Sequence, residues 1–201
     1  MNAVDEKLLG GCNYITHKTN EYLGWNKYSL STISFGAGTL GCLYVGGEIL
    51  WDAISKSQPS LTLLSLFSGW FGAGLAHQGF VRNPELEKME EQSTTTGVIP
   101  GDLEKEAGTQ GRSFMGTAYL FAFSTLFSQG IRNHFFPYAG ISEVSNTTTM
   151  GEIAVALWLS GMNFGFYFRS CDYHPRGPGK LQQWWNSLSF TLAQKENPVS
   201  I

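Results

Sequence analysis

Four long stretches of this chain contain no Asp, Glu, Lys or Arg over most or all of their length, and charged residues return close to their ends. The longest covers residues 57–81 and lies between Lys56 and Arg82. As a helix, about 25 residues span roughly 37 Å, which exceeds the roughly 30 Å of a bilayer hydrocarbon core. The pattern therefore predicts a membrane-spanning helix at 57–81.

The other three stretches predict three further spans. Residues 28–47 are rich in glycine and moderately apolar, residues 113–131 lie between Arg112 and Arg132, and residues 150–168 contain a charge-free core of about 16 residues. The expected fold class is therefore all-α. We expect a polytopic membrane protein with four transmembrane helices in two antiparallel hairpins.

Polar or amphipathic segments surround this membrane domain, which covers residues 28–169. Residues 1–27 mix apolar and charged positions and predict an interfacial helix, and residues 170–201 form a juxtamembrane tail. Within the tail, residues 181–194 place five apolar side chains on one helical face, typical of a second interfacial helix or of packing against another subunit. The acidic segment 82–112 is expected to be a solvated connector or a docking surface.

The basic residues predict an orientation. Of the 13 Lys and Arg residues, all but Lys56 and Arg132 belong to the two terminal segments or to the middle segment and its borders. The positive-inside rule then places both termini and residues 82–112 on the cytoplasmic side. The loop after Arg132 faces outward, and there Asn146 begins a triplet that matches a glycan acceptor. We expect these tryptophans to anchor the protein at the membrane interface: Trp25, Trp51, Trp184 and Trp185.

Composition agrees with a small membrane protein. Charged residues make up 14% of the chain, against about 25% in soluble domains, and glycine occurs 24 times. The mean hydropathy of −0.10 is low because the polar middle segment and the termini dilute the spans. A net charge of −3 provides no basic face for nucleic acid, which we exclude as a partner. Three widely spaced cysteines do not predict a disulfide framework.

Glycines within the spans are expected to let helices approach closely. Gly36, Gly38 and Gly41 also match the G-x-G-x-x-G pattern of dinucleotide sites. The strand and the acidic residue that such a site requires are missing, so helix packing is the favoured interpretation. The glycines expected to mediate packing are Gly36, Gly38, Gly41, Gly69, Gly72, Gly161 and Gly165.

A few residues suggest chemistry within or beside the spans. His77 is the one histidine inside a predicted span, and a haem or pigment ligand is one interpretation, with a hydrogen-bonded interfacial histidine as the other. Glu48, Gln129 and Asn163 are candidates for an ion path, although Gln129 and Asn163 also suit hydrogen bonds between helices.

A zinc site is a further hypothesis on the cytoplasmic side. Cys12 and His17 precede the first span, and Cys171 and His174 follow the last. Two thiolates and two imidazoles complete a tetrahedral site if the two termini meet. The alternative is that all four are ordinary juxtamembrane residues.

No catalytic motif is present, so the sequence favours a protein that is not an enzyme. The leading hypothesis is a membrane subunit or scaffold that contacts lipids and other membrane subunits or copies of itself. The alternatives are a small oligomeric channel or transporter unit and a subunit that binds a cofactor or pigment. The identity of any cofactor stays open.

Overall fold

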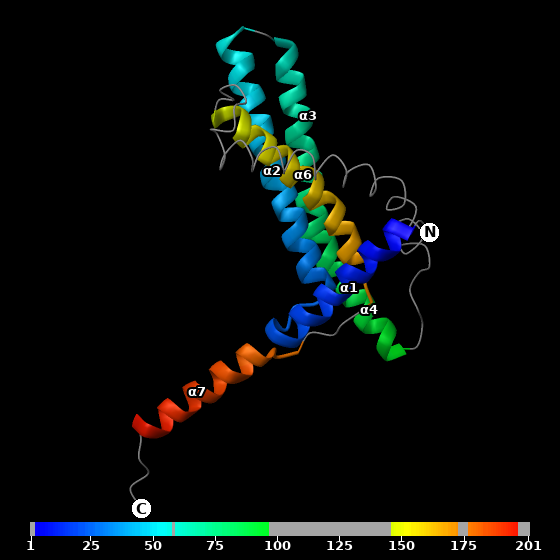
Figure 1. The fold of residues 1–201 in the computed structure, drawn as a ribbon, viewed down its shortest axis with the longest axis vertical. Coiled ribbons are helices and arrows are strands. Elements are labelled where there is room, and N and C mark those ends of the chain that lie inside the picture. Colours follow the sequence, from blue (N-terminus) through cyan, green and yellow to red (C-terminus); the bar gives the residue numbers. More distant parts are fainter. Residues whose placement is uncertain (1–2, 58, 97–145, 173–176, 197–201) are drawn as a thin grey trace, which may run out of the picture.

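The computed structural model describes residues 3–57, 59–96, 146–172 and 177–196, and these form helices and no strand (Figure 1). The all-α prediction is confirmed for this part of the chain. The predicted span 113–131, which includes Gln129, lies outside the described residues. The helices are α1 (Ala3–Leu23), α2 (Lys27–Ser55), α3 (Pro59–Ala76), the π-helix η1 (His77–Arg82), α4 (Asn83–Thr96), α6 (Asn146–Arg169) and α7 (Lys180–Glu196).

Helix α2 is longer than the predicted span 28–47. It begins after Asn26, whose side chain caps the first turn by accepting bonds from the backbone N–H groups of Tyr28 and Ser29, each at 3.0 Å. It then continues through Glu48 and its neighbours to Ser55. An ion pair one turn apart, between the Lys56 ammonium and Asp52 at 2.8 Å, supports its last turn. The reversal into α3 is correspondingly short.

The second helix does not end where the sequence suggested. The predicted span ends at residue 81, and α4 begins at Asn83, but α3, η1 and α4 follow one another without a break. Pro84 lacks an N–H group and cannot bond to the carbonyl one turn before it. The preceding turn widens, so that the Asn83 N–H reaches the carbonyl of Gln78, five residues back. A single π-turn thus absorbs the proline without breaking the helix.

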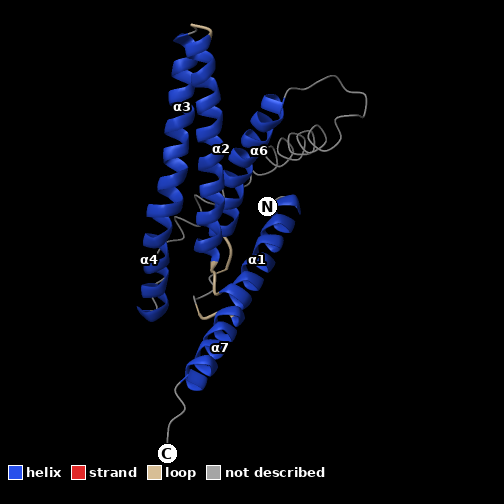
Figure 2. Cartoon of the chain, turned by 90° about the vertical axis from the view of Figure 1, so that its left-hand side faces the viewer, coloured by secondary structure: helices blue, strands red, loops and turns tan. Residues whose placement is uncertain are grey.

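Helix α2 is the central helix, with α3 and η1 antiparallel to it on one side and α6 antiparallel on another (Figures 1 and 2). Hydroxyl groups on one helix donate to carbonyl oxygens on its neighbour, and this sets the register with α3 and η1. The bonds between these helices are Thr32 to Gly79 at 2.8 Å, Thr39 to Gly72 at 3.3 Å, Ser68 to Cys42 at 2.8 Å and Ser65 to Gly46 at 2.7 Å. Such bonds hold helices together where hydrophobic burial does not.

Glycines bring α2 and α6 almost into backbone contact. A Cβ atom on Gly161 would lie 2.3 Å from the Gly38 nitrogen, and one on Gly41 would lie 2.4 Å from the Ala154 carbonyl oxygen. The Ser31 hydroxyl also donates to the carbonyl of Gly165 on α6 at 2.7 Å. Only glycine fits at Gly41 and Gly161 while the two helices stay this close.

Large apolar side chains face outward from this bundle. Leu40 on α2 is 67% exposed, and Leu63 and Trp70 on α3 are each 72% exposed, whereas Ser31 and Cys42 are fully buried. By length and composition, one described helix, Lys27–Ser55, is suited to crossing a membrane. Of its most apolar window, 28% is buried inside the protein.

The remaining helices gather at the end of the bundle where α2 begins, which we call the base. Helix α1 packs against the end of α6, α4 continues downward from η1, and α7 projects away from the bundle (Figure 1). In the second view, α1 and α7 follow one another as a single oblique rod (Figure 2). The base therefore joins three parts of the chain that are distant in sequence: α1 with the start of α2, η1 with α4, and the end of α6 with α7.

Candidate functional site

A partly buried polar network joins three helices at the base, and we call it the basal cluster: Thr32, Gln78, Asn83 and Arg169. The Arg169 guanidinium donates to the Asn83 side-chain oxygen through Nε at 3.0 Å and Nη2 at 2.6 Å. It also donates to Gln78, from Nη1 to Oε1 and from Nη2 to the backbone oxygen, each at 2.9 Å. The cation at the end of α6 is thus bound to the turn between η1 and α4.

Asn83 completes the connection to α2. Its amide nitrogen donates to the Thr32 hydroxyl at 3.0 Å, and its side chain is 1% exposed. Asn83 therefore uses both ends of its amide, one toward α6 and one toward α2. A buried amide satisfied in this way specifies one arrangement of the helices, because leaving either end unpaired costs about 1–3 kcal/mol.

Aromatic rings cover the inner side of the same cation. The Arg169 guanidinium carbon lies 5.1 Å from the centre of the Phe35 ring and 5.7 Å from that of Phe166, which is cation–π range. The two rings pack edge to face with centroids 5.2 Å apart. Phe35 is fully buried and also contacts Gly165, where a Cβ would approach its ring atoms to 2.7 Å. The glycine contact and the polar network therefore support each other.

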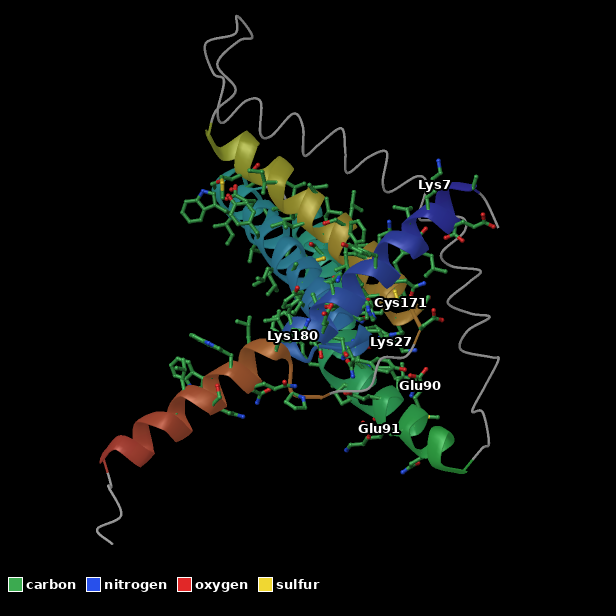
Figure 3. All side chains as sticks on the ribbon, turned by 60° about the horizontal axis from the view of Figure 1, so that its bottom comes forward. Lys7, Lys27, Glu90, Glu91, Cys171 and Lys180 are labelled. Carbon is green, nitrogen blue, oxygen red and sulfur yellow. The ribbon has the colours of Figure 1, made fainter. Side chains whose placement is uncertain are left out.

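A second set of polar contacts fixes α4 against the start of α2. Lys27, whose side chain is 7% exposed, donates to Glu90 on α4 at 2.7 Å (Figure 3). The Asn26 amide donates to Glu87 one turn earlier. A buried lysine is stable only with such a partner, because desolvation opposes its charge. Helix α4 therefore belongs to the base and is not merely a solvated connector at this point.

The N-terminal helix α1 meets the end of α6. The Tyr167 hydroxyl donates to the buried Asp5 carboxylate at 2.8 Å. Cys12 and Cys171 are both buried in one apolar cluster, and both are free thiols. The pKa of Cys12 is raised from 9.0 to about 12, mainly by burial and to a smaller extent by the nearby thiol of Cys171.

This arrangement brings together half of the predicted zinc ligands. Cys12 and Cys171 share a cluster, whereas His17 is exposed on α1 and His174 lies outside the described residues. Within the described ranges, no group of three or more His, Cys, Asp or Glu side chains is placed to hold a metal ion. Neutral, apolar surroundings favour the protonated thiol over the thiolate that a metal requires.

Glycines also join α1 to the segment before α7. Gly24 has a φ of +72°, and a Cβ there would lie 2.2 Å from the Gly177 carbonyl oxygen. A Cβ on Gly179 would lie 2.4 Å from the Tyr22 carbonyl oxygen. Two backbones cross here with no room for side chains.

An ion-pair group strengthens this joint. Glu21 on α1 accepts hydrogen bonds from Lys180 and from Lys18, and these bonds lower its pKa from 4.5 to about 2. The same contacts raise the pKa of both lysines. The first turn of α7 is thus fixed to α1, while the rest of the described α7 side chains extend into the surroundings.

A cavity of about 790 Å³, which we call the basal pocket, opens between these elements. It lies between the α1–α2 corner, the first turns of α2, the π-turn and the segment that leads into α7. Its lining is mostly apolar and contains no charged residue. The lining residues are Leu23, Gly24, Trp25, Ser29, Thr32, Ile33, Gly79, Phe80, Pro84, Gly177, Pro178 and Gln182.

The single-residue candidates from the sequence lie apart. His77 is exposed at the first position of η1 and does not line the pocket. Glu48 is exposed on α2, whereas Asn163 is buried on α6 next to the Gly38 contact. Gly38 and Glu48 are about 15 Å apart along the α2 axis. These two candidates therefore lie at different heights along the bundle, and their role in an ion path stays a prediction.

The predicted interfacial tryptophans are all exposed: Trp25 by 41%, Trp51 by 70%, Trp184 by 58% and Trp185 by 65%. Trp25 lies at the base, Trp51 lies near the α2–α3 turn, and the other two lie on α7. The exposed tryptophans therefore lie at both ends of the bundle, and their role as interface anchors stays a prediction.

The predicted packing glycines differ in what surrounds them. Gly38, Gly41, Gly161 and Gly165 lie at the α2–α6 contact, and Gly72 would place a Cβ 3.0 Å from the Cβ of Cys42. Gly36 has ordinary space, with the Phe80 ring 3.7 Å away. Among the residues that the structure describes, nothing lies within 4 Å of a Cβ on Gly69. That position faces outward from α3 instead of toward α2.

Sequence reasoning did not identify the basal cluster. Arg169 was interpreted only as the charge that ends the last span, and Asn83 only as a helix start. The signal that was present is the proline after Asn83 in an otherwise continuous helical pattern, since a tolerated proline marks a widened turn. Thr32 has no comparable signal, because single threonines are common in membrane helices.

No protein-family model matches the chain, and neither a curated protein nor a solved structure is found to be similar to it. Function is therefore argued from the geometry above.

Proposed function

We propose that this chain is an integral membrane subunit or scaffold without enzymatic activity, with four spans and its base on the cytoplasmic side. The observation that carries the proposal is the distribution of side chains in the α2–α3–α6 bundle. Glycine, serine and threonine make the closest contacts between the helices beside a small apolar core that includes Phe35 and Leu75, whereas many large side chains such as Leu40, Leu63 and Trp70 face outward. In water, large apolar side chains are favoured inside and polar ones outside. In lipid this preference is absent, and small residues between the helices are favoured because they allow close packing.

The positions of the described helices support an even number of spans. Helix α4 leaves the bundle at the base, where Lys27 contacts Glu90, whereas α6 starts toward the opposite end and reaches the base only at Arg169 (Figure 1). A segment that joins α4 to α6 has to return along the bundle. Residues 113–131 are the charge-free stretch of span length between them. This is the basis for proposing a third span there.

The charges support the proposed orientation. Lys56 lies at the α2–α3 turn, and every other basic side chain in the described ranges belongs to α1, α4, α7 or the basal ends of α2, η1 and α6. Lys27 and Lys180 are seen at this end in Figure 3. Basic residues concentrate on the cytoplasmic side of membrane proteins, so the base is proposed to face the cytoplasm.

Helix α7 is proposed to lie in the membrane surface. Leu181, Trp184 and Trp185 are each more than half exposed, and α7 contacts the rest of the chain through its joint with α1. An amphipathic helix with adjacent tryptophans suits the head-group region, where ring and N–H are both satisfied. Because α7 adjoins the base, the proposed orientation would put it on the cytoplasmic surface.

The first test is membrane extraction. Membranes from cells that express the chain are washed with sodium carbonate at pH 11 and then with mild detergent. The proposal expects the protein to stay in the pellet after carbonate and to dissolve in detergent. Recovery as a monomer in the carbonate supernatant would refute it.

The second test is orientation, measured with a maleimide that does not cross membranes. The three native cysteines are all buried, so the wild type provides a low background. A Ser57→Cys variant carries its thiol at the α2–α3 turn, and a matched Lys88→Cys variant carries it on exposed α4. Intact cells should label the first variant and not the second until they are permeabilised. The opposite labelling, or equal labelling of both, would contradict the proposed topology.

The subunit role is tested by purification in mild detergent followed by identification of what copurifies. A stable, stoichiometric membrane protein partner or a defined homo-oligomer supports it. A homogeneous monomer that binds neither would refute the assembly part of the proposal while leaving membrane residence intact.

A further inference from the structure

The basal pocket opens beside the outward-facing surface of α2. Ile33 lines the pocket, and Leu40 lies two turns further along the same face, 67% exposed. The pocket is therefore continuous with the apolar surface that the proposed function assigns to lipid. An open apolar cavity at that position adjoins both the hydrocarbon region and the head groups.

Specific contacts hold the pocket walls in place. One wall is formed by segment 177–178, held against the α1–α2 corner by the backbone crossing at Gly24. The opposite wall includes Gly79 of the π-turn, fixed by the bond that Thr32 donates to its carbonyl. A Cβ on Gly24 would displace the backbone of Gly177, and a Cβ on Gly79 would lie 3.0 Å from the Cβ atom of the buried Phe35, so close packing at glycines holds both walls in place.

The lining selects an apolar occupant. Leu23, Trp25, Ile33 and Phe80 line the pocket and are exposed by 38%, 41%, 50% and 62%. Leaving this surface in water is unfavourable by about 25 cal/mol per Å² of apolar area. Three polar side chains line the pocket: Ser29, Thr32 and Gln182. Thr32 already donates to Gly79 and accepts from Asn83, and Ser29 donates to the side-chain oxygen of Asn26. The pocket thus offers much apolar surface and few hydrogen bonds.

The surrounding charges argue against an anionic ligand. The two cations next to the lining are Arg82 and Lys180, and each is paired, with Glu85 at 3.3 Å and with Glu21 respectively. A phosphate or carboxylate ligand would have to compete with these carboxylates. A head group without net charge has no such competition.

We propose that the basal pocket binds an acyl chain of one zwitterionic membrane phospholipid, held at the cytoplasmic end of the bundle. The inference rests on the proposed membrane location. A volume of about 790 Å³ lies within the roughly 300–1,000 Å³ of sites for small molecules. The chain enters between Ile33 and Phe80, and its head group remains at the level of Trp25.

The test uses full-length protein in nanodiscs of phosphatidylcholine, transferred to mild detergent and measured by native mass spectrometry. The wild type should retain one phosphatidylcholine per chain through washing. In the Ile33→Trp variant the larger side chain occupies the pocket, and retention should fall by about tenfold or more. The matched control is Leu40→Trp, which makes the same type of change on the same helix face away from the lining. Its retention should equal that of the wild type.

A second measurement locates the bound lipid directly, without a substitution in the protein. A phosphatidylcholine with a photoreactive diazirine near the end of its acyl chain is cross-linked, and the adducts are mapped to peptides. The proposal expects adducts on Ile33 and Phe80 that disappear when excess unlabelled lipid is added. Equal retention by Ile33→Trp and wild type, or adducts spread evenly along α2 and α3, would overturn it. These failures differ from failure of the proposed function, in which the protein is not retained in carbonate-washed membranes at all.

Discussion

Replacing Gly161 by alanine tests the α2–α6 contact directly. The added Cβ would lie 2.3 Å from the Gly38 nitrogen, 2.5 Å from the Ser34 carbonyl oxygen and 2.6 Å from the Gly38 Cα, and all three atoms belong to the backbone. No side-chain rotation relieves such a contact. Since ordinary van der Waals distances begin near 3.4 Å, the helices have to separate by about 1 Å.

The energetic effect of this separation has two parts. Overpacking of a close contact costs about 1–3 kcal/mol. The bond from Ser31 to the Gly165 carbonyl, now 2.7 Å, would lengthen beyond hydrogen-bonding distance and remove about 0.6 kcal/mol more. The intrinsic helix preference of alanine offsets up to about 1 kcal/mol. We therefore expect Gly161→Ala to lower the unfolding free energy by about 1–3 kcal/mol.

The matched control is Gly69→Ala on α3. A Cβ at Gly69 meets nothing within 4 Å in the described part of the chain, so this change keeps the helix-preference gain without the steric penalty. Both variants are unfolded reversibly in mixed micelles with increasing SDS, and helix content is followed by circular dichroism. Equal stabilities of the two variants, or a larger loss for Gly69→Ala, would refute the assignment of the close contact to Gly161.

Three further predictions address the base. Arg169→Leu removes the four hydrogen bonds from the guanidinium and leaves the side-chain oxygen of the buried Asn83 without that donor, so we expect a loss of about 2–4 kcal/mol in the same unfolding assay. A loss below about 0.5 kcal/mol would contradict the role of the basal cluster. The pKa of Glu21 is lowered, so its pairing with Lys180 is complete above its ordinary pKa of 4.5 and is lost as the pH falls through about 2. Energy transfer between dyes on α1 and α7 should therefore fall between about pH 4 and pH 2, and the Glu21→Gln variant should lack this transition. The raised pKa of Cys12 keeps its thiol protonated at pH 8, so maleimide should modify Cys12 only after SDS unfolding; rapid labelling of the folded protein would show that the thiol is accessible.

The sequence predicted the helical character of the described chain well, because helix formation and exclusion of charge are local properties. Residues 57–81 and 150–168 both lie largely within helices, and the amphipathic stretch 181–194 lies within α7. The predicted positions of the helix ends were less accurate. The continuation of α2 through Glu48 to Ser55 depends on charges that reach solvent and pair at the helix end, which an apolar window does not register.

The functional site was largely invisible to sequence reasoning. Cys12 and Cys171 were named as a pair only on the condition that the termini meet, and the packing of α1 against α6 is what brings them together. Arg169 and Asn83 are unremarkable as single residues. Their importance comes from being placed within 3 Å of each other by helices that are more than 80 residues apart in the chain.

The sequence by itself determined that the described chain is helical, that long stretches of its helices exclude charge, and that glycine is abundant where helices can meet. Only the tertiary structure decided which glycines make contact, because Gly161 faces α2 whereas Gly69 faces outward. The same holds for the π-turn at Pro84 and for the basal pocket. The physical reason is that hydrogen bonds between residues close in sequence stabilise each helix. The face that a helix turns toward its neighbour, and how closely the two helices approach, depend instead on how their side chains interlock.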